Sequence, residues 1–144
     1  MNIEELQVKS NTENKNIICP GLYKYFKHEE MGTVNNYIYA TMFISEPENE
    51  YETILNNLFN TTGVNIITVK LTEDETTITL FEKDGTYYHN PKDCDEKLVI
   101  YKSLYDCSRF PCARQLRLFA SEVDKSKYPD VKQKYNFELI NSEY

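Results

Sequence analysis

The apolar residues of this chain fall into short runs separated by turn residues, and only one stretch has the spacing of a helix. Short runs rich in Tyr, Ile, Val and Phe are typical of β-strands. We expect strands near 22–26, 36–44, 64–71, 76–82, 86–89, 97–104, 116–119 and 135–140. Asp84 and Gly85 form the strongest short-range hairpin signal, between two of these runs. The pattern predicts an α+β, mainly β fold: a small curled antiparallel sheet or SH3-like partial barrel, with one amphipathic helix packed on it.

The one helical stretch is residues 46–60. Its apolar residues recur at the i, i+3, i+4, i+7 and i+8 positions that form one stripe of a helix, namely Tyr51, Ile54, Leu55, Leu58 and Phe59. Ser45 and Glu48 resemble a capping box, and Gly63 lies where a helix would end. The spacing therefore predicts a helix over 46–60 whose apolar stripe packs on the core.

The length of 144 residues (17.0 kDa) corresponds to about one domain. Residues 1–17 are predicted to form a flexible arm, because their polar run buries too little apolar surface to become ordered, and residues 18–144 a single domain. No apolar run approaches the ~20 residues of a membrane span, so no membrane partner is expected. The acidic, polar N-terminus lacks a secretion signal, which favours a cytoplasmic location.

The net charge of -7 is unevenly distributed. Residues 97–134 hold nine Lys or Arg against four Asp or Glu, a balance of +5, and the remainder carries -12. All three arginines, Arg109, Arg114 and Arg117, lie within this basic segment. Arginine suits carboxylate and phosphate groups, so the segment could bind an anionic small molecule or nucleic acid. Attraction between the two halves of one domain is the other interpretation.

The four cysteines, Cys19, Cys94, Cys107 and Cys112, include no C-x-x-C pair. A structural metal site normally has closely spaced ligand pairs, so no metal is expected. Four glycines build no phosphate-binding loop, and no cofactor is expected. Cys107 with His28 or His89 could form a nucleophilic pair, but inert thiols are the favoured interpretation.

Three motifs resemble a bacterial family, domain-of-unknown-function family 1653. Its members open with Pro-Gly-x-Tyr-x-x-Phe-Lys, as at 20–27, and continue with Val-x-Tyr-x-x-Leu-Tyr. They close with Arg-Pro-Leu-x-x-Phe. The second motif is matched at 99–105 and the third at 114–119, and the aromatic and basic ending at 128–135 is also similar. The resemblance covers about 20–45 and 96–137.

The chain departs from the family pattern at three places. His28, Glu29 and Glu30 replace a glycine-containing turn, Gln115 replaces the proline of the third motif, and 46–92 resembles an insertion. The resemblance implies a compact small barrel and no assigned activity.

The first functional prediction is a non-enzymatic binding module. Aromatic side chains beside arginine suit anionic planar ligands such as nucleotides. The predicted ligand-binding residues are Tyr23, Tyr25, Lys27, Tyr101, Tyr105, Arg109, Arg114 and Arg117. The competing interpretation is that the tyrosines fill a small core and the arginines pair with the chain's own acids.

The alternative prediction is an acidic protein-interaction module, an adaptor or inhibitor, that contacts a protein partner through 46–92. Its basis is the set of glutamates at 46–52 and the acidic turn at 73–75. An enzyme is the third possibility and is not favoured, because Glu29 or Glu30 beside His28 has the spacing of no recognised catalytic motif.

Overall fold

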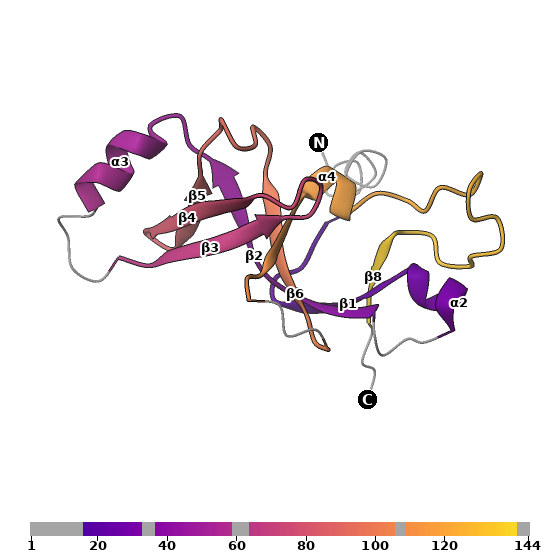
Figure 1. The fold of residues 1–144 in the computed structure, drawn as a ribbon. Helices are drawn as coiled ribbons and strands as arrows, with labels where there is room; N and C mark the ends of the chain where they lie inside the picture. The colour runs from indigo at the N-terminus through magenta and orange to yellow at the C-terminus, as the bar shows by residue number, and fades with distance from the viewer. Residues whose placement is uncertain (1–15, 33–36, 59–63, 106–108, 141–144) are drawn as a thin grey trace, which may run out of the picture.

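A computed structural model describes residues 16–32, 37–58, 64–105 and 109–140 (Figure 1). The strands in these ranges are β1 (Gly21–Tyr25), β2 (Ile38–Pro47), β3 (Ile66–Leu71), β4 (Thr77–Lys83), β5 (Thr86–His89), β6 (Leu98–Ser103), β7 (Cys112–Gln115) and β8 (Phe137–Leu139). The helices are α2 (Lys27–Met31), α3 (Tyr51–Leu58) and α4 (Leu116–Phe119). The predicted mainly β class of fold is confirmed. Most of the predicted N-terminal arm, residues 1–15, lies outside the described residues.

Six of the strands close into a barrel. The strand order is β5-β4-β3-β7-β6-β2, and β2 pairs back with β5. β1 pairs with the outer part of β2, and β8 pairs with β1, so these two strands extend the sheet beyond the barrel. Two pairings, β2 with β5 and β3 with β7, are parallel, which the predicted antiparallel sheet did not include.

The long strand β2 serves both the barrel and the extension. Its first half, from Ile38 to Thr41, pairs with β1, and its last residues pair with β5. The register against β6 shifts between Thr41 and Phe43, which is a β-bulge. Because a bulge bends a strand and increases its twist, β2 can pair with different neighbours on the two sides of Met42.

Two aromatic and aliphatic clusters lie on opposite faces of β6. Leu98 and Ile100 point into the barrel, where they pack with residues of β3, β4 and β7. Val99 and Tyr101 pack on the other face with Tyr23, Phe119 and Phe137. All four consecutive residues Leu98–Tyr101 are buried, as expected of a strand covered on both faces.

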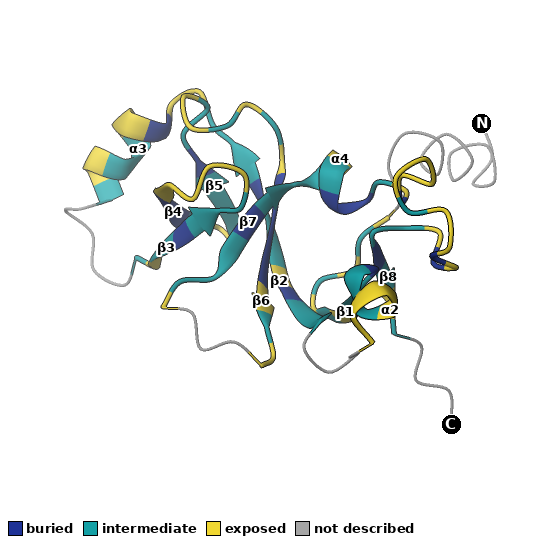
Figure 2. Ribbon diagram, turned by 45° about the vertical axis from the view of Figure 1, so that its right-hand side comes forward, coloured by how far each residue is buried: buried dark blue, intermediate teal, exposed yellow. Residues whose placement is uncertain are grey.

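The predicted helix begins later than the sequence indicated. Residues 45–47 continue β2, and α3 begins at Tyr51, so the predicted capping box at Ser45 is wrong. The Tyr51 hydroxyl donates to the Thr79 carbonyl at 2.6 Å, and the Tyr51 ring lies 5.2 Å from that of Phe81. Figure 2 shows the remainder of α3 with a largely exposed outer surface. Phe59 and Gly63 lie outside the described residues.

A second difference concerns residues 112–119. The sequence predicted a strand over 116–119, whereas the strand β7 occupies Cys112–Gln115 and the residues after it form α4. Pairing with β6 explains the difference, because Arg114 and Gln115 lie opposite Val99 and Leu98 in the ladder. The apolar side chain of Phe119 is then buried against Tyr23 and Tyr101 from a helical turn.

The segment 46–92 supplies three of the six barrel strands, β3, β4 and β5. The hairpin between β4 and β5 turns at Asp84 and Gly85, whose φ angles are 53° and 86°. Positive φ at both central residues is the requirement of a type I′ turn, and Asp-Gly satisfies it. The hairpin prediction is confirmed, and the barrel cannot close without this segment.

A buried polar pair joins β2 to β5 at the closure of the barrel. The Ser45 Oγ lies 2.7 Å from His89 Nδ1, and both residues are fully buried. His89 Nε2 lies 2.9 Å from the Glu96 carbonyl oxygen, which can only accept, so Nε2 carries the proton. Burial lowers the pKa of His89, although the bond to Glu96 opposes the shift. Cys107, for which a nucleophilic pair with His28 or His89 was the less favoured interpretation, lies outside the described residues.

Gly21 is packed too closely to accept a larger residue. A Cβ at this position would lie 2.9 Å from the Ile18 carbonyl oxygen and 3.3 Å from the Tyr23 ring. Because the first contact is with backbone, Gly21→Ala is expected to destabilise the fold by about 1–3 kcal/mol. Thermal unfolding should show a midpoint several degrees lower, whereas Leu22→Ala, at an exposed neighbouring side chain, should change it little. An unchanged midpoint for Gly21→Ala would contradict the prediction.

Candidate functional site

Three of the eight predicted ligand-binding residues line one cavity. Tyr25 of β1, Tyr101 of β6 and Arg114 of β7 surround a space of about 230 Å³ beside the barrel. The other lining residues are Tyr39, Thr72, Lys102, Ser103, Phe110, Cys112 and Phe137. We call this the Tyr/Arg pocket.

Strand register places these side chains together. Tyr25 lies opposite Phe137 in the pairing of β1 with β8, and Tyr101 lies opposite Cys112 in the pairing of β6 with β7. Residues directly opposite one another in a ladder share a face of the sheet. The Tyr25 and Phe137 ring centroids are consequently 4.7 Å apart, and the Tyr39 ring lies 5.6 Å from that of Tyr101.

Arg114 is the partly buried cation of the pocket. Its guanidinium carbon lies 5.4 Å from the centre of the Phe137 ring, and its Nε is buried with no hydrogen-bond partner. Burial opposes the positive charge, but Tyr101 and then Tyr25 outweigh it and raise the pKa of Arg114. The ion pairs formed among the described residues join Lys27 to Glu30, Lys70 to Glu75, Lys92 to Glu52 and Arg117 to Glu96. None of these four pairs includes Arg114.

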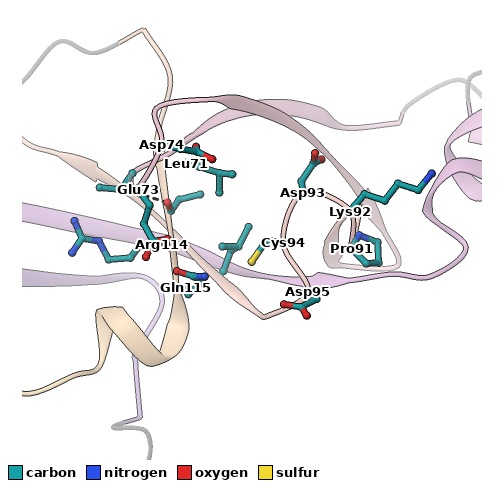
Figure 3. Close-up of a pocket in the computed structure, with 13 residues that line it drawn as sticks. Leu71, Glu73, Asp74, Pro91, Lys92, Asp93, Cys94, Asp95, Arg114 and Gln115 are labelled. Carbon is teal, nitrogen blue, oxygen red and sulfur yellow. Dashed lines mark hydrogen bonds between the residues drawn. The ribbon is translucent and has the colours of Figure 1, made fainter.

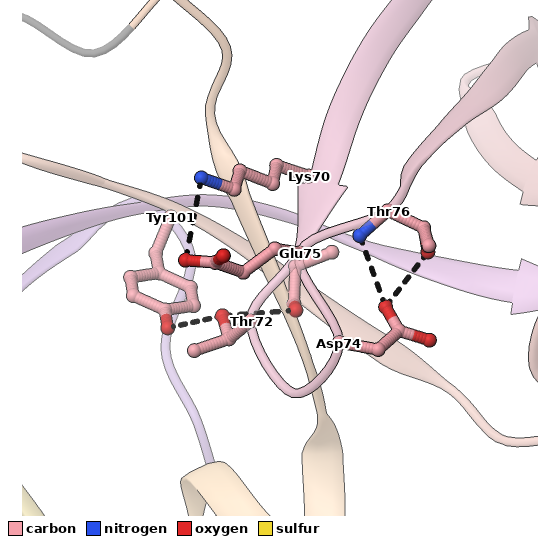
Figure 4. A network of polar contacts seen from close by, with 7 residues as sticks. Lys70, Thr72, Asp74, Glu75, Thr76 and Tyr101 are labelled. Atoms are coloured by element: carbon pink, nitrogen blue, oxygen red, sulfur yellow. Dashed lines mark hydrogen bonds and ion pairs between the residues drawn. The ribbon is translucent and has the colours of Figure 1, made fainter.

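Two tyrosines of the pocket, Tyr39 and Tyr101, keep their protons at neutral pH. Burial, followed by the neighbouring Tyr101, raises the pKa of Tyr39 to about 12. Burial also raises the pKa of Tyr101, although Arg114 opposes this shift. The Tyr101 hydroxyl lies 2.9 Å from the Thr72 hydroxyl at the end of β3 (Figure 4). Protonated phenols can donate hydrogen bonds, so the pocket combines the positive charge of Arg114 with neutral donors.

The other predicted residues lie elsewhere. Tyr23 is buried in the core, where its hydroxyl accepts a hydrogen bond from the Ile18 amide at 2.9 Å. Lys27 lies in α2, and its Nζ donates to the Tyr128 hydroxyl at 2.9 Å. Neither Tyr23 nor Lys27 lines the Tyr/Arg pocket. For Tyr23, the competing interpretation of a core tyrosine describes the structure.

The three arginines occupy separate environments. Arg117 pairs with Glu96 through Nε at 2.6 Å, as the competing interpretation of internal pairing proposed. Arg109 is exposed, and its guanidinium carbon lies 5.3 Å from the Phe110 ring. Tyr105 is 55% exposed and does not line the pocket. Closeness in sequence therefore did not bring the arginines into one site.

Sequence reasoning missed three lining residues with direct consequences for the pocket: Tyr39, Lys102 and Phe137. Tyr39 had a detectable signal, because it lies in an aromatic run of alternating spacing. Phe137 had none, since its position depends on the pairing of β8 with β1, two strands more than a hundred residues apart.

A second cavity, of about 340 Å³, has the opposite electrostatic character (Figure 3). The turn after β3 and the loop after β5 line it with four carboxylates, those of Glu73, Asp74, Asp93 and Asp95. It shares Thr72 and Arg114 with the Tyr/Arg pocket. In Figure 3 the Arg114 guanidinium extends away from the loop of Asp93 and Asp95.

No family model, no curated protein and no solved structure matches the chain. The resemblance to domain-of-unknown-function family 1653 therefore stays a prediction. None of the helices in the described part of the chain has the length and apolar character needed to cross a membrane. The described residues also contain no group of three or more His, Cys, Asp or Glu side chains placed to hold a metal ion.

Proposed function

We propose that this protein is a binding module whose Tyr/Arg pocket holds the anionic group of a small ligand. The observation that carries the proposal is the buried Nε of Arg114, a charged donor without an acceptor. A buried donor without a partner costs about 1–3 kcal/mol, and more where the group is charged. An oxygen of an anionic ligand would provide the missing acceptor.

The composition of the lining supports an anion as the ligand. The lining contains two basic side chains, those of Lys102 and Arg114, and no Asp or Glu. This is unusual in a chain of net charge -7. Arginine offers a planar fork of donors that matches carboxylate or phosphate.

The same lining favours binding over catalysis. It contains neither histidine nor carboxylate, which are the commonest general bases. Tyr39, with a pKa of about 12, does not accept a proton at neutral pH.

The test is a calorimetric titration of the full chain with sodium acetate and with inorganic phosphate at low ionic strength. Wild-type protein is expected to bind at least one of them, and Arg114→Gln to weaken that binding at least tenfold, about 1.4 kcal/mol. Arg117→Gln is the matched control, because Arg117 is exposed and paired with Glu96. Equal binding by wild-type protein and Arg114→Gln would refute the proposal.

The alternative, a protein-interaction surface over 46–92, stays a prediction. Deleting the segment cannot test it, because the deletion would remove β3, β4 and β5 from the barrel. Glu52→Lys and Asp74→Lys instead change exposed charge and leave the strands in place. Loss of a co-purifying partner from both variants would support the alternative, and its retention by both would count against it.

A further inference from the structure

We infer that the ligand of the Tyr/Arg pocket is a small monocarboxylate with an apolar or aromatic body, rather than a phosphate-bearing nucleotide. The inference rests on the proposed function and specifies which anion the pocket selects. Four features of the pocket carry it: the number of its charges, the form of its donors, the nature of its walls and the charge of its surroundings.

The first feature is the charge balance. Arg114 is the one lining cation that is partly buried, since Lys102, the other lining cation, is exposed. One guanidinium compensates one negative charge. A phosphate monoester carries about -1.5 to -2 at neutral pH, so part of its charge would be buried without a partner. Burying an uncompensated charge is costly, whereas a carboxylate brings a single charge.

The second feature is the set of donors. The guanidinium carbon of Arg114 lies over the Phe137 ring, 5.4 Å from its centre, so this ring occupies one side of the guanidinium. The Nε edge has a donor without a partner, and the hydroxyls of Tyr25 and Tyr101 interact with the guanidinium. A guanidinium edge and a planar carboxylate form two parallel hydrogen bonds. The phenol of Tyr39, protonated at neutral pH, is a further donor beside them.

The third feature is the aromatic wall. Half of the ten lining side chains are aromatic: Tyr25, Tyr39, Tyr101, Phe110 and Phe137. Such walls bind an apolar or ring-shaped body and offer little to a hydrated sugar. The volume of about 230 Å³ is below the ~300–1,000 Å³ typical of sites for drug-sized ligands, so the ligand is small.

The fourth feature is the adjoining cavity. Four carboxylates line it, and it shares Thr72 and Arg114 with the Tyr/Arg pocket. A chain of phosphates that entered the pocket would therefore have like charges close by. Because like charges side by side are repulsive and suppress wrong partners, this arrangement disfavours nucleic acid.

The experiment compares three probes that share a phenyl body and differ in the anionic group: benzoate, benzenesulfonate and phenyl phosphate. Each is titrated into the full chain by calorimetry at pH 8 and low ionic strength, and an oligothymidylate is added as a fourth probe. We expect benzoate to bind at least tenfold more tightly than phenyl phosphate and at least as tightly as benzenesulfonate. The oligothymidylate should bind no more tightly than phenyl phosphate.

The variants assign that binding to the pocket. Arg114→Gln should reduce benzoate affinity at least tenfold, and Arg117→Gln should leave it unchanged. Arg114→Lys keeps the charge and loses the fork, so it provides a second test if Arg114→Gln does not fold, and it should also bind benzoate more weakly. Tighter binding of phenyl phosphate or the oligothymidylate through Arg114 would overturn the inference and leave the proposed function standing. Failure of all four probes would overturn both.

Discussion

Phe137→Ala is expected to lower the free energy of unfolding by about 3–5 kcal/mol, the usual cost of removing a buried phenyl ring. Phe137 is fully buried, and its ring stacks on that of Phe119 with centroids 4.1 Å apart. It also contacts the rings of Tyr25, Tyr39 and Tyr101. Because folded domains are stable by about 5–15 kcal/mol, the substitution removes much of the stability.

The measurement is urea denaturation followed by circular dichroism. Phe137→Leu, which keeps most of the apolar volume, should cost less than about 1.5 kcal/mol, and Tyr105→Ala, at an exposed ring, about 0.5 kcal/mol or less. Phe137→Ala should also abolish anion binding, because the guanidinium of Arg114 lies over the Phe137 ring. A loss below about 1 kcal/mol would show that β8 contributes little to the fold.

The second large effect is a loss of stability in mild acid that depends on His89. Its pKa is lowered from the ordinary value of 6.5, chiefly by burial. Below pH 6.5 the unfolded chain therefore binds a proton that the folded protein does not, so stability falls as the pH is lowered and is fully present above 6.5. The slope is at most about 1.4 kcal/mol per pH unit, or up to about 2 kcal/mol between pH 6.5 and 5.

The free energy of unfolding should be measured at half-unit steps from pH 5 to pH 7.5. His89→Gln is expected to be less stable at every pH, because it disturbs the bonds to Ser45 and Glu96, and to have a flatter profile. His28→Gln, which removes the other histidine of the protein, is the comparison variant. The carboxylates with lowered pKa, Asp74 and Asp124, titrate below this window. Identical slopes for wild-type protein and His89→Gln would exclude His89 as the cause.

The strands, the helix α3 and the candidate site were predictable from the sequence to different degrees. Most of the strands and the hairpin were predictable, because alternation and the Asp84-Gly85 turn depend on neighbouring residues. The start of α3 was not predictable, because Ser45 is a residue type that caps helices but is here buried against His89. Where a polar residue suits two environments, the partner that the fold places beside it determines which environment it occupies.

The candidate site was predictable only in part. Tyr25, Tyr101 and Arg114 could be selected because each lies in an aromatic or basic motif. Two contacts could not be predicted: Arg117 pairs with Glu96, and Arg114 lies over Phe137. Each joins segments that are separated in the chain. Residues two apart in a strand point to the same face, but Arg117 follows the end of β7 and belongs to α4.

The sequence by itself determined where most strands lie and that an amphipathic helix occupies part of 46–60, because backbone preference and side-chain periodicity act over a few residues. Only the tertiary structure decided how those strands are ordered, and hence the parallel closure of β2 on β5. It also decided which side chains form the Tyr/Arg pocket. The physical reason is that these contacts close long loops, so they are selected by the burial of the whole set of aromatic rings around β6 and not by any local pattern.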